Sequence, residues 1–203
     1  MTELRTKDDV RAHYAEPHAL AKNKELRRLD RHCRQFISLA PFVVISTSDA
    51  AGRCDATPRG DAPGFVAIVD DATLLIPDRA GNNRVDTMLN IAENPHVGLL
   101  FLVPGMAETL RVNGRATITN DEAVLESLAA QGKLPQAAIR VDIEEIYFQC
   151  GKALLRSELW NAEKQVPRST FAPFGQIFSE HSRTEYDPAI EGMLEEEYRT
   201  GLY

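Results

Sequence analysis

Between residues 42 and 148 the chain is a succession of short apolar, β-branched segments separated by turn residues. The segment 97–103 is apolar throughout, which predicts a strand buried on both faces. Residues 109–118 instead alternate strictly between apolar and polar side chains, as in a strand with one buried face. Many short strands at this spacing favour a sandwich or barrel. The expected strands are 42–47, 54–59, 65–69, 73–76, 97–103, 109–118 and 139–148.

Helices are expected around and between these strands. Residues 30–40 begin with a capping aspartate and place four apolar side chains on one face, namely Cys33, Phe36, Ile37 and Ala40. Two further helices, 83–93 and 121–130, interrupt the β-region. A last helix follows Asp187 and Pro188 and carries the apolar stripe Ile190, Met193, Leu194 and Tyr198. The fold class is therefore mainly β with flanking helices, in one domain of three parts: a helical segment 1–40, a barrel 42–150 and a helical extension 151–203.

The composition limits the functions to consider. A hydrophobic content of 43% in 203 residues supports one sizeable core, and the net charge of −7 argues against a general nucleic-acid binder. No apolar run is long enough for a membrane helix, and the charged N-terminal residues lack an apolar signal core, so a cytoplasmic protein is expected. The three cysteines are scattered and the histidines form no ligand motif, which predicts neither a disulfide framework nor a bound metal.

One segment, 74–86, combines the features of an anion site. It passes from a strand through a glycine turn into a helix, and it carries Arg79 and Arg84. Asn83 is positioned to cap that helix, with Asp86 three residues later as in a capping box. A helix N-terminus with two arginines beside it is suited to bind a phosphate group. The alternative is that both arginines are solvated side chains on an ordinary loop.

Two other polar positions are candidates for ligand contacts. Arg59 and Gly60 end a strand in the sequence Thr-Pro-Arg-Gly-Asp, where a glycine leaves room for a flat ring against the main chain. The alternative there is a strand-terminating turn with a surface ion pair. Thr109 and Arg111 lie on the polar side of an otherwise apolar strand, and they can equally face solvent.

The order of these motifs resembles a known family. Thr-Pro-Arg-Gly-Asp is followed by Leu-Leu-Ile-Pro-Asp-Arg-Ala-Gly-Asn-Asn-Arg, by a helix ending in Glu-Asn-Pro, and by the strand Glu-Thr-Leu-Arg-Val-Asn-Gly-Arg-Ala. This succession is similar to the pyridoxamine 5′-phosphate oxidase-like, FMN-binding split-barrel family. It is closest to a subgroup in which a segment like Cys150–Trp160 follows the last strand. The resemblance covers about residues 30–162.

The resemblance implies a six-stranded split barrel and a homodimer with two FMN sites at its interface. The family's phosphate-binding pair corresponds to Asn83 and Arg84, with Arg79 nearby, and its flavin-contacting strand end corresponds to Arg59 and Gly60. Main-chain groups beside the ring correspond to Ile76, Pro77 and Asp78, and the polar residue of the long strand corresponds to Thr109. The same resemblance suggests that Lys152, Arg156 and Trp160 complete the partner's site, although a lone tryptophan is more often a core or interface anchor.

The departures from the family pattern limit the functional prediction. The Arg-x-x-Leu-Lys motif of the oxidases is reduced here, and the Trp and Arg of their closing C-terminal segment have no match in 179–203. Pyridoxamine phosphate is therefore not predicted as the substrate. The leading hypothesis is an FMN-dependent oxidoreductase for a small organic substrate or electron acceptor, and the alternative is a flavin-binding carrier or sensor. A minor third option replaces FMN by haem or a deazaflavin. Arg59, Arg111 and Lys152 are equal candidates to stabilise a reduced flavin, and no catalytic residue is assigned.

Overall fold

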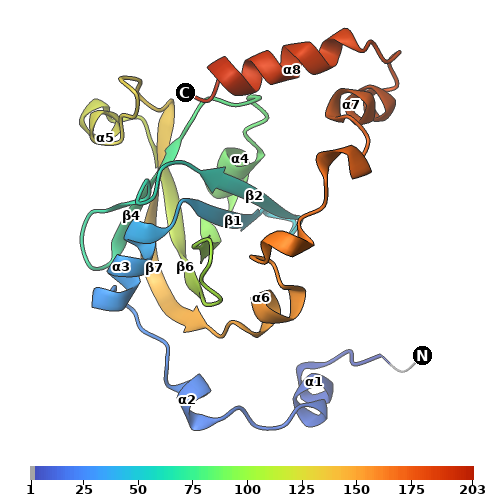
Figure 1. Ribbon diagram of the computed structural model, residues 1–203. Helices are drawn as coiled ribbons and strands as arrows, with labels where there is room; N and C mark the ends of the chain where they lie inside the picture. Colours follow the sequence, from blue (N-terminus) through green and yellow to red (C-terminus); the bar gives the residue numbers. More distant parts are fainter. Residues whose placement is uncertain (1–2) are drawn as a thin grey trace.

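The computed structural model describes residues 3–203 and contains one antiparallel sheet flanked by helices (Figure 1). The sheet order is β2-β1-β5-β6-β7-β4-β3, and every neighbouring pair is antiparallel. All seven strand segments expected from the sequence are present. The strands are β1 (Phe42–Ser48), β2 (Cys54–Gly60), β3 (Ala67–Ile68), β4 (Thr73–Asp78), β5 (His96–Leu102), β6 (Thr109–Thr119) and β7 (Ala137–Gln149).

The sheet curls strongly but does not close into a hydrogen-bonded barrel. Strands β2 and β4 are separated by four strands in the sheet order, yet the side chains of Arg59 and Asp78 at their ends approach to 3.5 Å. The family resemblance implied six strands, whereas the sheet has seven, because the two-residue β3 pairs with β4. The architecture is thus mainly β and consistent with a split barrel.

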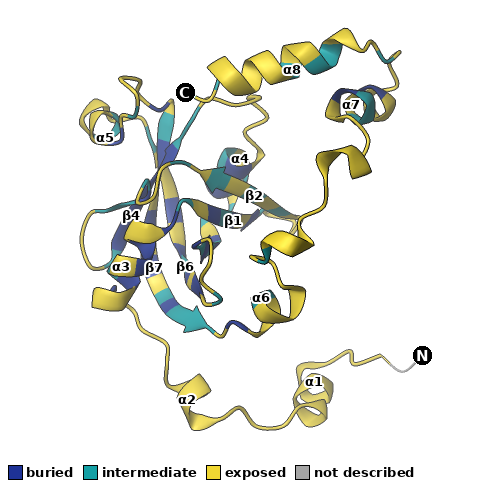
Figure 2. Cartoon of the chain, in the orientation of Figure 1, coloured by how far each residue is buried: buried dark blue, intermediate teal, exposed yellow. Residues whose placement is uncertain are grey.

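The core lies on the inner face of the curled sheet and is shown in dark blue in Figure 2. The helix α3 (Arg31–Leu39) covers one end of it, as expected from the sequence. Asp30 caps this helix by accepting a hydrogen bond from the Cys33 amide at 2.8 Å. The four apolar residues predicted for its inner face are all buried.

Strand β5 was expected to be buried on both faces, but in a single chain only one of its faces is fully buried. Val97, Leu99 and Phe101 are buried, but Leu100 and Leu102 on the opposite face are only half-buried. Both faces of the strand carry apolar side chains, but the packing within one chain covers only the inner face. Strand β6 follows the predicted alternation except that Thr109, expected on the polar side, is buried and Ile118, expected on the apolar side, is 39% exposed.

The remaining helices lie between the strands or at the two ends of the chain. The N-terminal α1 and α2 contain no buried residue and run away from the barrel as an arm (Figures 1 and 2). No helix of residues 3–203 is long and apolar enough to cross a membrane. The helices besides α3 are α1 (Lys7–His13), α2 (Ala19–Lys22), α4 (Asp86–Glu93), α5 (Glu122–Ser127), α6 (Lys152–Ser157), α7 (Phe174–Ser182) and α8 (Ala189–Thr200), with short 3₁₀ turns at Ala162–Lys164 and Arg168–Thr170.

Candidate functional site

A cleft of about 1010 Å³ lies between the barrel and the C-terminal helices. Its floor is formed by the ends of β2 and β4 and by the loop from β4 to α4. Its roof is formed by α7 and α8, and α8 passes above that loop in Figure 1. The volume is at the upper end of the range for small-molecule sites, which is roughly 300–1,000 Å³.

The cleft brings together most of the site residues expected from the sequence. The predicted residues that line it are Arg59, Gly60, Pro77, Asp78, Arg79, Asn83 and Arg84. They come from β2, β4 and the β4–α4 loop, so the curl of the sheet is what assembles them. Ile76 does not line the cleft, because its side chain is fully buried in the core. Only its main chain remains for any ligand contact.

Arg59 and Asp78 form a loose pair in the floor. The guanidinium Nη2 of Arg59 lies 3.5 Å from Asp78 Oδ1, and both side chains are largely buried. Burial raises the pKa of the Asp78 carboxyl, and the charge of Arg59 only partly opposes this effect. The Nε atom of Arg59 is buried and has no hydrogen-bond partner among residues 3–203. A buried donor of this kind is costly unless a ligand or water accepts its hydrogen.

Arg79 is held by the protein itself. Its Nε donates to Asp61 Oδ2 at 2.8 Å and its Nη1 donates to the Leu128 carbonyl at 2.8 Å. The Tyr203 hydroxyl donates to the other oxygen of Asp61 at 2.6 Å, and the guanidinium of Arg79 lies 5.7 Å from the Tyr203 ring centroid. Lys133 Nζ donates to the main-chain carbonyl of Tyr203 at 2.6 Å. These contacts fasten the end of the C-terminal segment to the barrel, and we call them the Tyr203 latch.

The latch also changes the proton affinity of Asp61. Burial alone would raise the pKa of this carboxyl, but hydrogen bonds from the Tyr203 hydroxyl, the Ala62 amide and Arg79 outweigh burial and hold the pKa below its ordinary value. The same hydrogen bond raises the pKa of the Tyr203 hydroxyl. Asp61 is therefore a charged acceptor at neutral pH, with an exposed fraction of only 5%.

The helix start predicted around Asn83 is wrong. Helix α4 begins at Asp86, its N-cap position is Val85, and no side chain caps it. Instead, Asn82 Oδ1 accepts the Arg84 amide at 3.1 Å, and Asn83 and Val85 adopt left-handed backbone conformations with φ of 57° and 52°. This local turn competes with the helix and delays it by three residues. A left-handed β-branched residue such as Val85 stores strain of about 1–3 kcal/mol.

Arg84 is the most accessible arginine of the cleft. Its side chain is 76% exposed, and its Nε donates to Asp86 Oδ2 at 2.8 Å. An exposed pair of this kind contributes little stability, about 0–1 kcal/mol, so a ligand can replace it at small cost.

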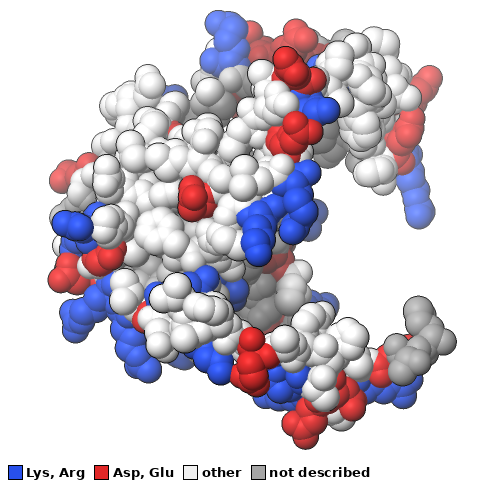
Figure 3. Space-filling model, turned by 60° about the horizontal axis from the view of Figure 1, so that its bottom comes forward, with Lys and Arg blue, Asp and Glu red and all other residues white. Residues whose placement is uncertain are grey.

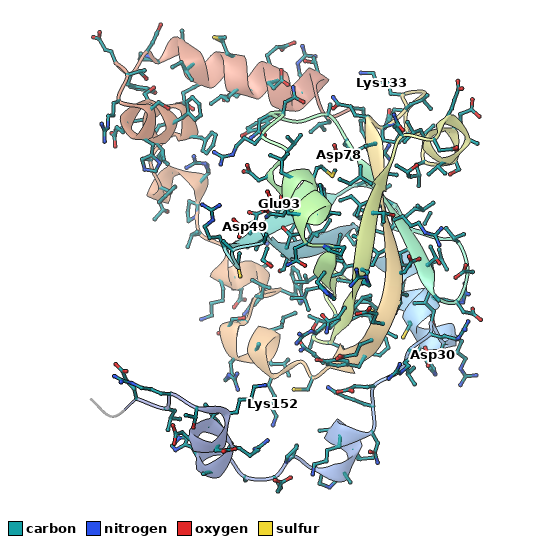
Figure 4. The ribbon with its side chains drawn as sticks, turned by 180° about the vertical axis from the view of Figure 1, so that it is seen from behind. Asp30, Asp49, Asp78, Glu93, Lys133 and Lys152 are labelled. Atoms are coloured by element: carbon teal, nitrogen blue, oxygen red, sulfur yellow. The ribbon has the colours of Figure 1, made fainter. Side chains whose placement is uncertain are left out.

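The other predicted site residues do not line this cleft. Figure 4 places Lys152 at the opposite end of the barrel from Asp78. Arg156 lies on the same helix, α6, and the segment that follows docks on the β5–β6 turn, where Trp160 Nε1 donates to the Met106 carbonyl at 2.7 Å. Thr109 is buried, and Arg111 is exposed near the Tyr147 ring. In one chain, therefore, the predicted residues form two separate groups.

The roof of the cleft does not follow from the sequence. The sequence predicts the apolar stripe of the last helix but not its position above the β4–α4 loop, because no local pattern specifies that contact. Asp61 and Tyr203 were likewise missed, since they are far apart in sequence. The apolar roof residues are Phe174, Phe178, Ile190, Met193, Leu194 and Tyr198.

The fold is that of a split-barrel protein, with a cleft where the ends of β2 and β4 approach each other. Residues 29–150 match the family model described as pyridoxamine 5′-phosphate oxidase. The match covers more than half of the chain, and the protein belongs to this family, as the sequence motifs indicated. No curated protein matches the chain in a sequence search.

Several solved structures share part of the fold. The HupZ protein of Group A Streptococcus is 22% identical, with 58% of this chain and 91% of that chain covered and a TM-score of 0.49. General Stress Protein 26 of Bacillus anthracis is 16% identical, with 58% and 93% covered and a TM-score of 0.44. The heme storage protein HutZ of Vibrio cholerae is 14% identical, with 61% and 94% covered and a TM-score of 0.40.

Proposed function

We propose that this protein is an FMN-binding oxidoreductase that acts on a small organic substrate or electron acceptor. The observation that carries the proposal is the buried, unpaired Nε of Arg59 at the floor of a 1010 Å³ cleft, opposite a loop that presents Arg84. A ring acceptor satisfies the Arg59 donor once a shift of the side chain turns its buried Nε toward the cleft, and a phosphate satisfies Arg84. A long, amphipathic ligand with a phosphate at one end fits this arrangement, and FMN is a ligand of this kind.

Different residues bind the phosphate and the ring system of such a cofactor. Arg84 and the main chain around Asn83 bind the phosphate, and Gly81 leaves open space for it because no atom lies within 4 Å of a Cβ built there. Arg59 and Asp78 lie where the ring system binds. FMN supplies the electron or hydride transfer when bound, and the protein contributes position and charge. The positive charge of Arg59 favours an anionic ligand, and the carboxyl of Asp78 holds a proton more readily than an ordinary aspartate does.

A second copy of the chain completes each site in this proposal. Lys152, Arg156 and Trp160 lie too far from the cleft to contribute to it within one chain. The surface in Figure 3 is hollowed between the N-terminal arm and the C-terminal segment, and Lys and Arg side chains gather on its wall. The half-buried Leu100 and Leu102 give the outer face of β5 an apolar surface that a partner can cover.

The dimer is tested by multi-angle light scattering of the purified chain. Leu100→Asp is expected to yield a monomer with a strongly reduced affinity for FMN, because a charge is then placed in the apolar contact. A matched substitution in the exposed arm, Leu20→Asp, should leave both the mass and the affinity unchanged, since Leu20 is 77% exposed. A wild-type monomer that binds FMN at full affinity would contradict the contribution of a second copy.

The cofactor is tested by comparing FMN with riboflavin, which lacks the phosphate. Arg84→Ala is expected to weaken FMN about fivefold, corresponding to about 1 kcal/mol for an exposed charge-assisted bond, and to leave riboflavin binding unchanged. Arg59→Ala should weaken both ligands, because it acts on the ring. Arg53→Ala is the control, since this arginine is 86% exposed and does not line the cleft. Failure of the wild-type protein to bind FMN, or its binding of haem instead, would refute the assignment.

A flavin carrier or sensor is the competing function. The described residues that line the cleft include no histidine, cysteine or lysine, so the chain adds little chemistry of its own to a bound flavin. Anaerobic reduction of the FMN-loaded protein by NADH or NADPH, followed by reoxidation with candidate acceptors, separates the two functions. Reduction and reoxidation over many cycles indicate an enzyme, and the absence of both indicates a carrier.

A further inference from the structure

The C-terminal helices present an unusually apolar surface to a cleft whose floor is charged. Phe178 is 59% exposed and Met193 is 72% exposed, and both line the open cleft beside the barrel. Phe174 and Tyr198 are also exposed large side chains of the same lining. Isolated apolar residues on a surface are ordinary, but a group that faces one cleft indicates a binding surface.

The roof is a defined structure and not a loose end of the chain. Helices α7 and α8 pack closely at Gly175, where a Cβ would lie 2.7 Å from Ile190 Cγ2. Tyr186 adds a hydrogen bond from its hydroxyl to Glu191 Oε1 at 3.3 Å. The Tyr203 latch then fixes the far end of this helical pair to the barrel. The apolar side chains are thus held above the cleft in a fixed position.

The charges of the cleft are separated between floor and roof. The floor lining contains three arginines and a single carboxyl, that of Asp78, whereas the roof contributes the carboxylate of Glu197. An anionic group is therefore attracted to the floor and repelled from the roof. The part of the cleft beneath the helices favours a ligand that is uncharged and apolar.

We propose that α7 and α8 form a substrate compartment for an uncharged, planar aromatic molecule, bound between the roof side chains and the ligand on the floor. This inference rests on the proposed function for the identity of the floor ligand, FMN. The aromatic and thioether side chains of Phe178 and Met193 suit flat rings, because they offer polarizable surface without hydrogen-bonding groups. The cleft, at about 1010 Å³, is as large as the largest small-molecule sites, roughly 1,000 Å³, so a ligand on the floor need not fill the space beneath the roof.

The test uses 2-naphthol as an uncharged planar probe and 2-naphthalenesulfonate as its anionic counterpart. Binding to the full chain is measured by calorimetry with and without FMN. Phe178→Ala and Met193→Ala are each expected to weaken 2-naphthol about tenfold and to leave FMN affinity unchanged, because each removes about 50 Å² of apolar contact. Val166→Ala is the control, since Val166 is 77% exposed and lies outside the cleft lining.

The charge of the roof gives a second readout. The sulfonate is expected to bind at least tenfold more weakly than 2-naphthol, and Glu197→Gln should reduce that difference. Equal 2-naphthol affinity in wild type, Phe178→Ala and Met193→Ala would overturn the proposal, whether or not FMN binds. If FMN fails to bind but 2-naphthol still depends on Phe178, the compartment stands and the proposed cofactor does not.

Discussion

The Tyr203 latch makes a quantitative prediction about the C-terminal helices. Tyr203→Phe removes the hydroxyl that donates to Asp61 Oδ1 at 2.6 Å and keeps the ring beside the Arg79 guanidinium. A hydrogen bond to a charged group contributes about 1.5–3 kcal/mol. The half-buried position of Tyr203 favours the lower end, so the loss should be about 1.5 kcal/mol. The population with α8 detached from the barrel should then increase about tenfold.

Amide hydrogen exchange measures that population directly. Amides of α8 (Ala189–Thr200) are expected to exchange about tenfold faster in Tyr203→Phe, whereas amides of β6 and β7 should be unchanged. Tyr14→Phe is a matched control, because Tyr14 is 63% exposed on the N-terminal arm. Identical exchange of α8 in wild type and Tyr203→Phe would show that the latch does not hold the roof, and the reasoning from the Asp61 hydrogen bonds would be refuted.

Three further predictions concern pH and packing. The lowered pKa of Asp61 means that its stabilising contribution is present above the ordinary carboxyl pKa, about 3.9, and is lost as the pH falls through the folded value. The protection of α8 amides, measured relative to their exchange in an unfolded chain at the same pH, should therefore fall in acid, and Asp61→Asn should abolish this dependence. The effect of Asp78 on stability has the opposite pH dependence, because its pKa is raised. Its contribution to the free energy of unfolding is present below about pH 3.9 and is lost as the pH rises through the folded pKa. Asp78→Asn should therefore reduce the fall in the urea-unfolding free energy over that pH range. Gly114→Ala should destabilise the protein by about 3 kcal/mol in urea unfolding, since its Cβ would lie 2.2 Å from the Asp142 carbonyl oxygen, whereas Gly192→Ala, with open space around it, should not destabilise.

The parts of the fold that depend on local patterns were predictable from the sequence. The capped helix at Asp30 and the alternating strand at 109–118 both follow from neighbouring residues, and both are present. The start of α4 depends on a competition between two local turns. The capping-box pattern at Asn83 favours the earlier start, but the turn in which Asn82 Oδ1 accepts the Arg84 amide forms instead.

The assembly of the cleft depends on contacts that sequence patterns do not encode. Arg59 and Asp78 are brought together by the curl of a sheet in which their strands are far apart. Their grouping was expected only through the family resemblance. The roof had no equivalent signal, because the family's closing C-terminal residues are absent here. An apolar stripe on a helix predicts that the helix is partly covered, but not by what.

The charges of the cleft suggest that its three arginines are not equivalent. Each is paired with an aspartate: Arg59 with Asp78, Arg79 with Asp61, and Arg84 with Asp86. A phosphate must therefore compete with a carboxylate for each guanidinium. The Arg79 pair is short, largely buried and reinforced by the latch, so breaking it would leave a buried charge without a partner at a cost of several kcal/mol.

A ligand displaces the aspartates of the other two pairs more easily. Arg84 is exposed, and its pair with Asp86 is worth about 1 kcal/mol at most. Arg59 holds Asp78 at 3.5 Å and keeps one donor unused. An anionic ligand thus gains from Arg84 and Arg59, while Arg79 keeps the roof attached. Arg79→Ala should consequently increase the exchange of α8 amides by a larger factor than it decreases the affinity for FMN. The opposite order of effects would indicate that Arg79 binds the phosphate.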